Sequence, residues 1–127
     1  MNFLLDTHTI LWALSDDEKL SEKAKFEILA TDNNKFISLI SAWEVAIKIS
    51  LNKLSLEGGV VQFLRQIEGD GFELLPIRAE HIALVETLPF HHRDPFDRLI
   101  VATAIAESMT IITADANIRL YNINCIW

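Results

Sequence analysis

Short runs of hydrophobic residues recur along the chain and predict the strands of a buried sheet. The first four runs cover residues 3–5, 36–40, 72–75 and 110–113. Most of their positions are apolar without a regular alternation, which is typical of parallel strands that are covered on both faces. Residues 121–127 alternate between larger apolar side chains and mostly polar neighbours, and this pattern predicts a final strand.

The segments between these runs predict helices. Apolar residues three and four positions apart mark one helical face within 60–67 and a shorter one within 82–88. The segment 99–106 is apolar almost all round, so its helix is expected to be central and buried. The most loop-like stretch, residues 52–59, is expected to be a flexible insert. Helices between successive strands predict an α/β fold, with a central parallel sheet of about five strands flanked by helices on both faces.

Composition indicates one domain over residues 1–127. Half of the residues are hydrophobic (50%), which is enough for one core. No run approaches the ~18 uninterrupted apolar residues of a membrane-spanning helix, and the first six residues lack the basic region of a signal peptide. We therefore expect no membrane association. The single cysteine, Cys125, cannot form an intramolecular disulfide, which fits a reducing, cytoplasmic location.

The charge of the chain is acidic, since 18 acidic residues against 11 basic ones give a net charge of −7. This sign argues against a protein that coats nucleic acid through its own charge. It does not exclude a nuclease, because metal ions bound to acids can present positive charge to a phosphate. An acidic surface also suits a basic protein partner.

Four acidic side chains lie where the predicted strands end or where the following helices begin. They are Asp6, Glu44, Asp97 and Asp115. The carboxyl ends of parallel strands meet at one edge of a sheet, so we expect these side chains to converge there. Crowded carboxylates repel one another unless cations are present. A set of hard oxygen ligands selects Mg²⁺ or Mn²⁺ over zinc, and two such ions roughly 4 Å apart can activate water and stabilise the leaving oxygen of a phosphodiester.

Each of the four acids also has an ordinary structural explanation. Asp6 and Asp115 are typical N-cap or turn residues. Glu44 completes an S-x-x-E capping box and could instead pair with Lys48 four residues later, while Asp97 favours the dipole at a helix N-terminus. With caps alone the chain would be a metal-free α/β binding module, which should bind no Mn²⁺. If the acids crowd together, replacing Asp6 or Asp115 with Asn should leave metal-free stability unchanged or higher.

Other chemistries fit the sequence less well. Haloacid-dehalogenase-like phosphatases also begin with a strand and an aspartate, but they need a second acid where this chain has His8. The neighbouring His91 and His92 could suggest zinc, yet ligands so close along the chain rarely bind one tetrahedral ion. Arg93 and Arg98 are candidates for phosphate contacts.

Four segments resemble, in order and spacing, the motifs of a known family. They are FLLDTH at 3–8, SAWEVAIK at 41–48, HRDPFDRLIVA at 92–102 and IITAD at 111–115. Together they resemble the PIN-domain family, and in particular the VapC-like ribonuclease toxins of type II toxin–antitoxin pairs. The resemblance implies a Mg²⁺- or Mn²⁺-dependent endoribonuclease that acts on RNA, forms a homodimer and is blocked by a cognate antitoxin. It gives catalytic and metal-binding roles to Asp6, Glu44, Asp97 and Asp115, and it makes Thr113 a polar neighbour of the site.

The three tryptophans, Trp12, Trp43 and Trp127, are expected mainly in the core. We also hypothesise that an antitoxin segment lies across an apolar groove near Trp12 and Trp43. It would place a basic side chain among the acids, and arginine is favoured there because its planar guanidinium pairs two carboxylate oxygens at once.

Overall fold

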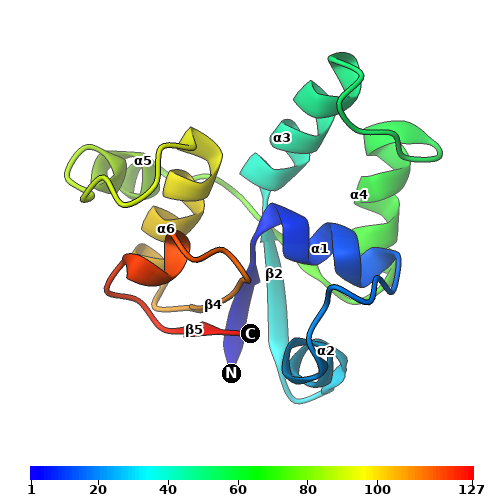
Figure 1. Cartoon of the computed structure of the whole chain (residues 1–127), viewed down its shortest axis with the longest axis horizontal. Coiled ribbons are helices and arrows are strands. Elements are labelled where there is room, and N and C mark those ends of the chain that lie inside the picture. The colour runs from blue at the N-terminus through cyan, green and yellow to red at the C-terminus, as the bar shows by residue number, and fades with distance from the viewer.

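Five short parallel strands form one sheet at the centre of the computed structural model, which describes residues 1–127 (Figure 1). Along the sheet the order is β3-β2-β1-β4-β5, and every neighbouring pair is parallel. The carboxyl ends of the strands therefore share one edge. The strands are β1 (Asn2–Leu5), β2 (Asn34–Ser38), β3 (Glu73–Leu75), β4 (Thr110–Ile112) and β5 (Cys125–Ile126).

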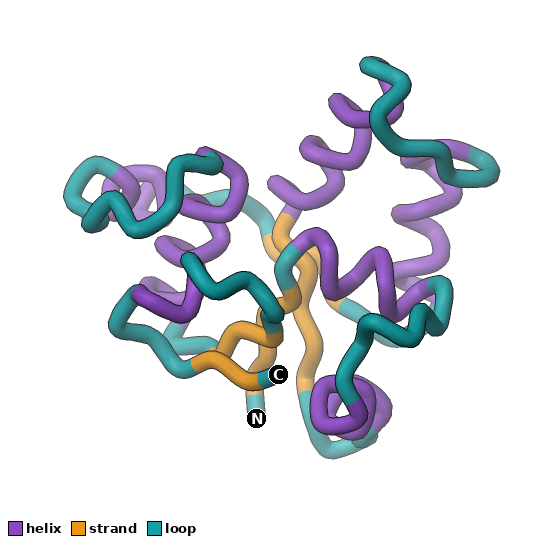
Figure 2. The backbone as a smooth tube through the Cα atoms, viewed as in Figure 1, coloured by secondary structure: helices purple, strands orange, loops and turns teal.

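Helices cover both faces of this sheet, as predicted (Figure 1). Figure 2 shows how short the strands are compared with the helices and loops around them. On one face lie α1 (Thr7–Leu14), α2 (Glu22–Leu29) and α4 (Gly59–Gly69), and on the other lie α5 (Ala79–Val85), α6 (Pro95–Glu107) and the short 3-10 helix η1 (Ile118–Leu120). The remaining helix, α3 (Leu39–Ser50), continues directly from β2 and contacts both α4 and α6. None of these helices is long and apolar enough to cross a membrane.

Alternating side chains of the central strands build two hydrophobic cores, one on each face. Leu5 and Ile112 pack with α1, α2 and α4, whereas Leu4 and Ile111 pack with α6. All four side chains are fully buried. Because these strands are buried on both faces, consecutive side chains in them are apolar, which explains the continuous apolar runs in the sequence.

The start of α3 differs from the prediction. The apolar run 36–40 does not end as a strand, because the Ser38 hydroxyl accepts a hydrogen bond from the Ile40 amide (3.1 Å) and caps a helix there. Ser41 is therefore already inside the helix and buried. The predicted capping box that begins at Ser41 is wrong, since Glu44 lies in the second turn of α3.

The C-terminal strand is also shorter than the predicted 121–127. Only Cys125 and Ile126 pair with β4, and Tyr121 instead packs its ring into the core on the α6 face. Helix α5 ends at Val85, so Leu88 is buried from the following turn rather than from the helix.

Candidate active site

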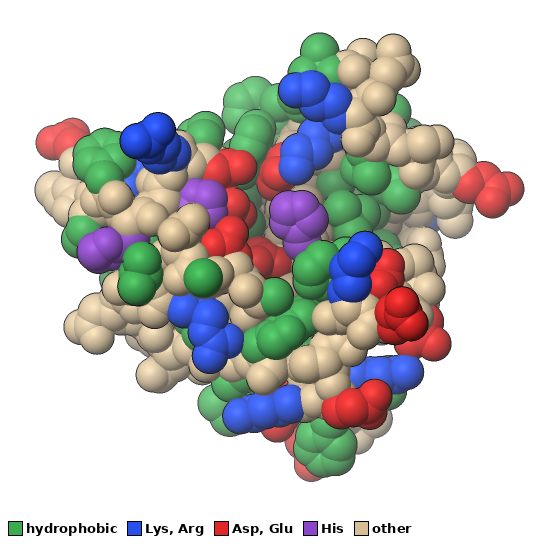
Figure 3. All heavy atoms as spheres, viewed as in Figure 1, with side chains coloured by type: hydrophobic (Ala, Val, Ile, Leu, Met, Phe, Trp, Pro, Cys, Tyr) green, Lys and Arg blue, Asp and Glu red, His purple; other side chains and the backbone are tan.

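Four carboxyl groups meet at the carboxyl edge of the sheet, and each is held by a different part of the fold. Figure 3 shows acidic side chains and histidines gathered near the middle of one face. The structure places all four predicted acids at this edge. They are Asp6 at the N-cap of α1, Glu44 in the second turn of α3, Asp97 in the first turn of α6 and Asp115 in the loop after β4.

Thr113 connects the ends of the two central strands. Its hydroxyl donates a hydrogen bond to Asp6 Oδ2 and accepts one from the Asp115 amide (2.9 Å). The other carboxylate oxygen of Asp6 accepts a hydrogen bond from the Thr9 amide (2.8 Å), so Asp6 caps α1 as its local sequence predicts. Capping and clustering are therefore compatible, because one oxygen serves the helix and the other faces β4.

Glu44 is buried and held from both sides. Its Oε1 accepts a hydrogen bond from the Thr7 hydroxyl (2.7 Å), and its Oε2 lies 2.7 Å from Lys48 Nζ. The pairing with Lys48, which was the structural alternative for Glu44, is thus present, although Glu44 is buried rather than part of a surface pair. A buried carboxylate needs such partners, since an isolated one would lose its hydration without compensation.

His92 joins Asp97 to Asp115. Its Nε2 lies 3.2 Å from Asp97 Oδ2 and 2.9 Å from Asp115 Oδ2. Sequence reasoning considered His92 only as part of a zinc site with His91, and it missed this contact. Its position five residues before Asp97 could have indicated a contact with that acid. No feature of the neighbouring sequence indicated that its ring would also reach Asp115 in the loop after β4. His91 is exposed and packs edge-on against the ring of Tyr121 instead.

Burial raises the pKa of two of the acids. Burial, followed by the negative charges of Asp94, Asp6 and Glu44, raises the pKa of Asp97 to about 7. Burial also raises the pKa of Asp6, against the lowering effect of its hydrogen bonds. Both environments oppose the ionised carboxylate, and Asp97 therefore favours a proton or a cation near neutral pH.

The pKa of Asp115 moves in the opposite direction to those of Asp6 and Asp97. Burial would raise its pKa, but hydrogen bonds from His92 and from the amides of Asn117 and Ile118 outweigh that effect and lower the pKa. Hydrogen bonds to the ionised carboxylate stabilise it. We therefore no longer expect Asp115→Asn to raise stability by relieving repulsion.

Arg98 is not available for phosphate contacts, and this prediction is wrong. The side chain is buried, and its Nη1 donates to the carbonyl of Pro89 (2.8 Å) and to the Tyr121 hydroxyl (3.1 Å). Its Nη2 donates to the carbonyl of Val85 (3.1 Å), so the guanidinium fixes the turn that follows α5. Arg93 is exposed, and its role stays a prediction.

Two of the three tryptophans, Trp12 and Trp43, line separate hollows. Trp12 is half-buried beside the acids, in a shallow hollow of about 210 Å³ that Asp6, His8 and Asp115 also line. Trp43 is 60% exposed, so the expectation that it belongs to the core is wrong. It lies in an apolar hollow of about 360 Å³ together with residues of α5 and α6. Trp12 and Trp43 therefore line different hollows, in contrast to the single groove of the hypothesis.

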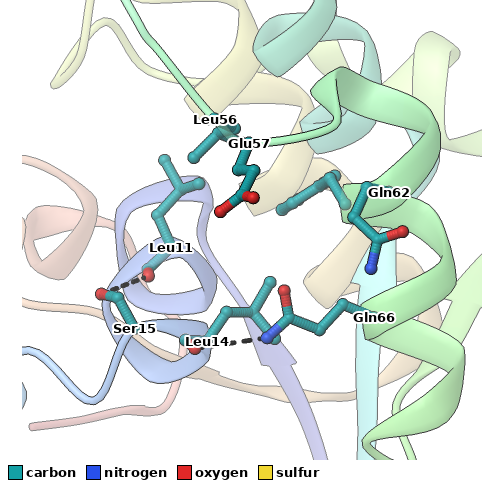
Figure 4. A pocket seen from close by; sticks show the side chains of 8 residues that line it. Leu11, Leu14, Ser15, Leu56, Glu57, Gln62 and Gln66 are labelled. Carbon is teal, nitrogen blue, oxygen red and sulfur yellow. Dashed lines mark hydrogen bonds between the residues drawn. The ribbon is translucent and has the colours of Figure 1, made fainter.

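A further apolar hollow of about 160 Å³ lies between α1 and α4 (Figure 4). Leu11 and Leu14 of α1 face Gln62 and Gln66 of α4 across it, and Leu56 closes one end. The Gln66 amide donates a hydrogen bond to the carbonyl of Leu14 (3.3 Å) and ties the two helices together.

The donor set of the acidic edge fits a hard divalent cation. Carboxylate oxygens dominate it, and groups of His92, Asp97 and Asp115 lie within 4.8 Å of one another. Burial and, after it, neighbouring negative charges oppose the ionisation of Asp97 and raise its pKa to about 7, and a bound cation would favour the ionised form instead.

Comparisons with known proteins agree with this geometry. A family model described as PIN domain matches residues 3–123. Ribonuclease VapC22 from Mycobacterium tuberculosis is 30% identical over 119 residues, which cover 91% of this chain and 88% of that protein.

Solved structures share the fold at lower identity. The crystal structure of VapBC2 from Rickettsia felis bound to a promoter DNA fragment matches with a TM-score of 0.72 and 21% identity, over 99% of this chain and 98% of that one. DNA-bound VapBC from Salmonella typhimurium matches with a TM-score of 0.70 and 18% identity, over 99% and 97% of the two chains.

Proposed function

Because this chain belongs to the PIN-domain family, we propose that it is an endoribonuclease that hydrolyses phosphodiester bonds in RNA with Mg²⁺ or Mn²⁺. The observation that carries the proposal is the convergence of Asp6, Glu44, Asp97 and Asp115, from four elements, at one edge of the sheet. The name of the 30% identical relative, a ribonuclease, supports the same activity.

The four carboxylates would hold the cation, and the residues around them keep these carboxylates in position. A bound divalent ion lowers the pKa of water and stabilises charge on the phosphate and the leaving oxygen. A bound cation would favour the ionised form of Asp97, because its positive charge would offset the neighbouring negative charges. Thr113 fixes Asp6, while Thr7 and Lys48 fix Glu44, so little side-chain motion is needed.

The experiment is an RNA cleavage assay with Asp97→Asn, which keeps the shape of the side chain and removes one charge. Cleavage should fall by more than roughly 100-fold, since even indirect supports of metal ligands are worth 10–100-fold. The matched control is Asp32→Asn, an exposed position in the turn before β2 that should retain full activity. Full activity in Asp97→Asn, or activity that survives EDTA, contradicts the proposal, and a folded protein that binds no Mn²⁺ indicates a non-catalytic module.

We further infer that the protein is the toxin of a toxin–antitoxin pair with a small antitoxin as its partner. Structures that share its fold include VapBC complexes and a toxin–antitoxin complex from Klebsiella pneumoniae. Helix α1 contributes Leu11 and Leu14 to the hollow of Figure 4 and Trp12 to the hollow beside the acids. An antitoxin segment that follows α1 would bury these apolar residues and bring a basic side chain to the carboxylates.

Competition between this side chain and the cation gives the test. Calorimetry of the co-encoded protein should show tighter binding without Mg²⁺ than with it, because both occupy the same carboxylates. Leu14→Glu should weaken binding in both conditions, whereas exposed Leu120→Glu on η1 serves as the control. Equal affinity with and without Mg²⁺, or no co-encoded binder, counts against the inference.

We infer that a second copy of the chain covers the apolar hollow around Trp43. The hollow is lined almost entirely by apolar side chains, and Trp43, Ile82 and the nearby Phe90 are exposed to 60%, 59% and 83%. Exposed aromatic and aliphatic side chains of this density mark interfaces. Light scattering should give a dimer for the wild type and a monomer for Trp43→Glu, while Phe26→Glu on α2, across the sheet, should remain dimeric. A monomeric wild type overturns this part of the proposal.

A further inference from the structure

The ring of His92 makes hydrogen bonds at both nitrogens. Its Nδ1 accepts a hydrogen bond from the Asp94 amide (3.1 Å), and its Nε2 lies 2.9 Å from Asp115 Oδ2 and 3.2 Å from Asp97 Oδ2. The ring is mostly buried, with 12% of its side-chain surface exposed. These contacts determine which nitrogen carries the proton.

A neutral imidazole has one N–H group and one nitrogen lone pair. Because the Asp94 amide donates to Nδ1, the lone pair of His92 lies on Nδ1 and the hydrogen on Nε2. Nε2–H then donates to the carboxylate of Asp115 and faces that of Asp97. In this tautomer Nε2 has no lone pair to offer a metal ion, although its position among the acids is that of a ligand.

The backbone of His92 is held in place by the Tyr121 hydroxyl, which also contacts Arg98. The Tyr121 hydroxyl accepts hydrogen bonds from the His92 amide (3.2 Å) and from the guanidinium of Arg98 (3.1 Å). Arg98 is buried in α6, the helix that also carries Asp97. The backbone of His92 is thus linked through Tyr121 and Arg98 to α6, the helix of Asp97, while its ring reaches Asp115 in the loop after β4.

We propose that His92 is a positioning residue that donates from Nε2 to hold Asp97 and Asp115 at the separation needed to share one cation, without ligating the cation itself. The inference rests on the proposed metal-dependent function and assigns His92 a role within it. It also excludes a zinc site built on this histidine, since the residues that face the cation are then oxygen donors alone.

Two substitutions of His92 test whether its Nε2 donates a hydrogen bond to the acids or binds the cation. In His92→Gln the side-chain amide nitrogen lies near the place of Nε2 and still donates, whereas in His92→Asn the amide is too short to reach Asp115. Calorimetric Mn²⁺ affinity should fall by roughly 10–100-fold in His92→Asn and remain within a few-fold of wild type in His92→Gln. His91→Asn, the same change at the exposed neighbouring histidine, should leave the affinity unchanged.

Nitrogen NMR of the ring supplies a readout that does not depend on activity. At about pH 8, where a free imidazole is neutral, the ring should show a protonated Nε2 and an unprotonated Nδ1, both without metal and with Mg²⁺. A proton that moves to Nδ1 when Mg²⁺ is added, together with loss of affinity in His92→Gln, would show ligation and overturn the proposal. Equal Mn²⁺ affinity in His92→Asn and wild type would also overturn it, whereas a wild type that binds no Mn²⁺ overturns the proposed function itself.

Discussion

At Asp97, burial and three neighbouring carboxylates act on one group, and the resulting pKa of about 7 couples folding to pH. The unfolded chain releases this proton near its ordinary pKa of 3.8, but the metal-free folded protein retains it up to about 7. Between these values the folded state binds more protons, so the contribution of Asp97 to the free energy of unfolding is present at low pH and is lost as the pH rises through this window.

We therefore expect a flatter pH dependence of stability in Asp97→Asn than in wild type. Urea unfolding in EDTA at a series of pH values measures it, and the difference between the two proteins should shift in favour of the variant as the pH rises toward 7. Parallel curves for both proteins over this range would show that Asp97 has an ordinary pKa.

Asp6 and Asp115 should respond in opposite ways to the same substitution. Burial raises the pKa of Asp6, so Asp6→Asn should leave metal-free stability unchanged or higher at neutral pH. Asp115 is ionised and accepts hydrogen bonds from His92 and two amides, so Asp115→Asn should cost about 1–2 kcal/mol. Urea melts in EDTA compare the two, and equal losses in both variants would favour plain capping roles.

At the scale of the elements, local chemistry decided what could be predicted from the sequence. Asp94 and Pro95 identify the start of α6, and the Asp94 carboxylate indeed accepts a hydrogen bond from the Phe96 amide (2.8 Å). The start of α3 could not be located in the same way. Both Ser38 and Ser41 are suitable caps, and only the register of β2 against β1 and β3 decides between them.

The same distinction holds for the site. The convergence of the four acids could be predicted because the carboxyl ends of parallel strands share one edge of the sheet, independently of the conformations of the loops. The roles of His92 and Arg98 could not, since they depend on Tyr121 and on the turn after α5, far along the chain. The sequence suggested phosphate contacts for Arg98, but its guanidinium instead donates hydrogen bonds to buried carbonyl oxygens.

Arg98 therefore acts as a link between α5 and α6, and its loss should be a stability defect. Arg98→Met keeps the length of the side chain but leaves the carbonyls of Leu88 and Pro89 without a donor, and it leaves that of Val85 with the Leu88 amide alone. We expect a loss of about 2–4 kcal/mol in the free energy of unfolding. Exposed Arg93→Met is the matched control and should change stability by less than about 0.5 kcal/mol; near-wild-type stability in Arg98→Met would contradict the structural role.

For the whole molecule, a net charge of −7 and a specific cation site predict different responses to divalent ions. Mn²⁺ at about 100 times its Kd should stabilise the folded protein by about 2.7 kcal/mol, which corresponds to a rise in Tm of roughly 5–15 °C. Asp97→Asn should show little of this rise. Equal shifts in both proteins would mean that Mn²⁺ only screens the net charge.

The position of β1 in the sheet has a consequence for synthesis on the ribosome. β1 is made first, but one of its two neighbours is β4, with Phe3 paired to Thr110, and Asp115 follows only after β4. Before β4 has been made, the growing chain contains Asp6, Glu44 and Asp97, but the strand that brings the last acid to the sheet edge is missing. For the proposed ribonuclease, this order means that the four acids converge only after β4 and Asp115 have been made, so the site is assembled late relative to the strand that begins it.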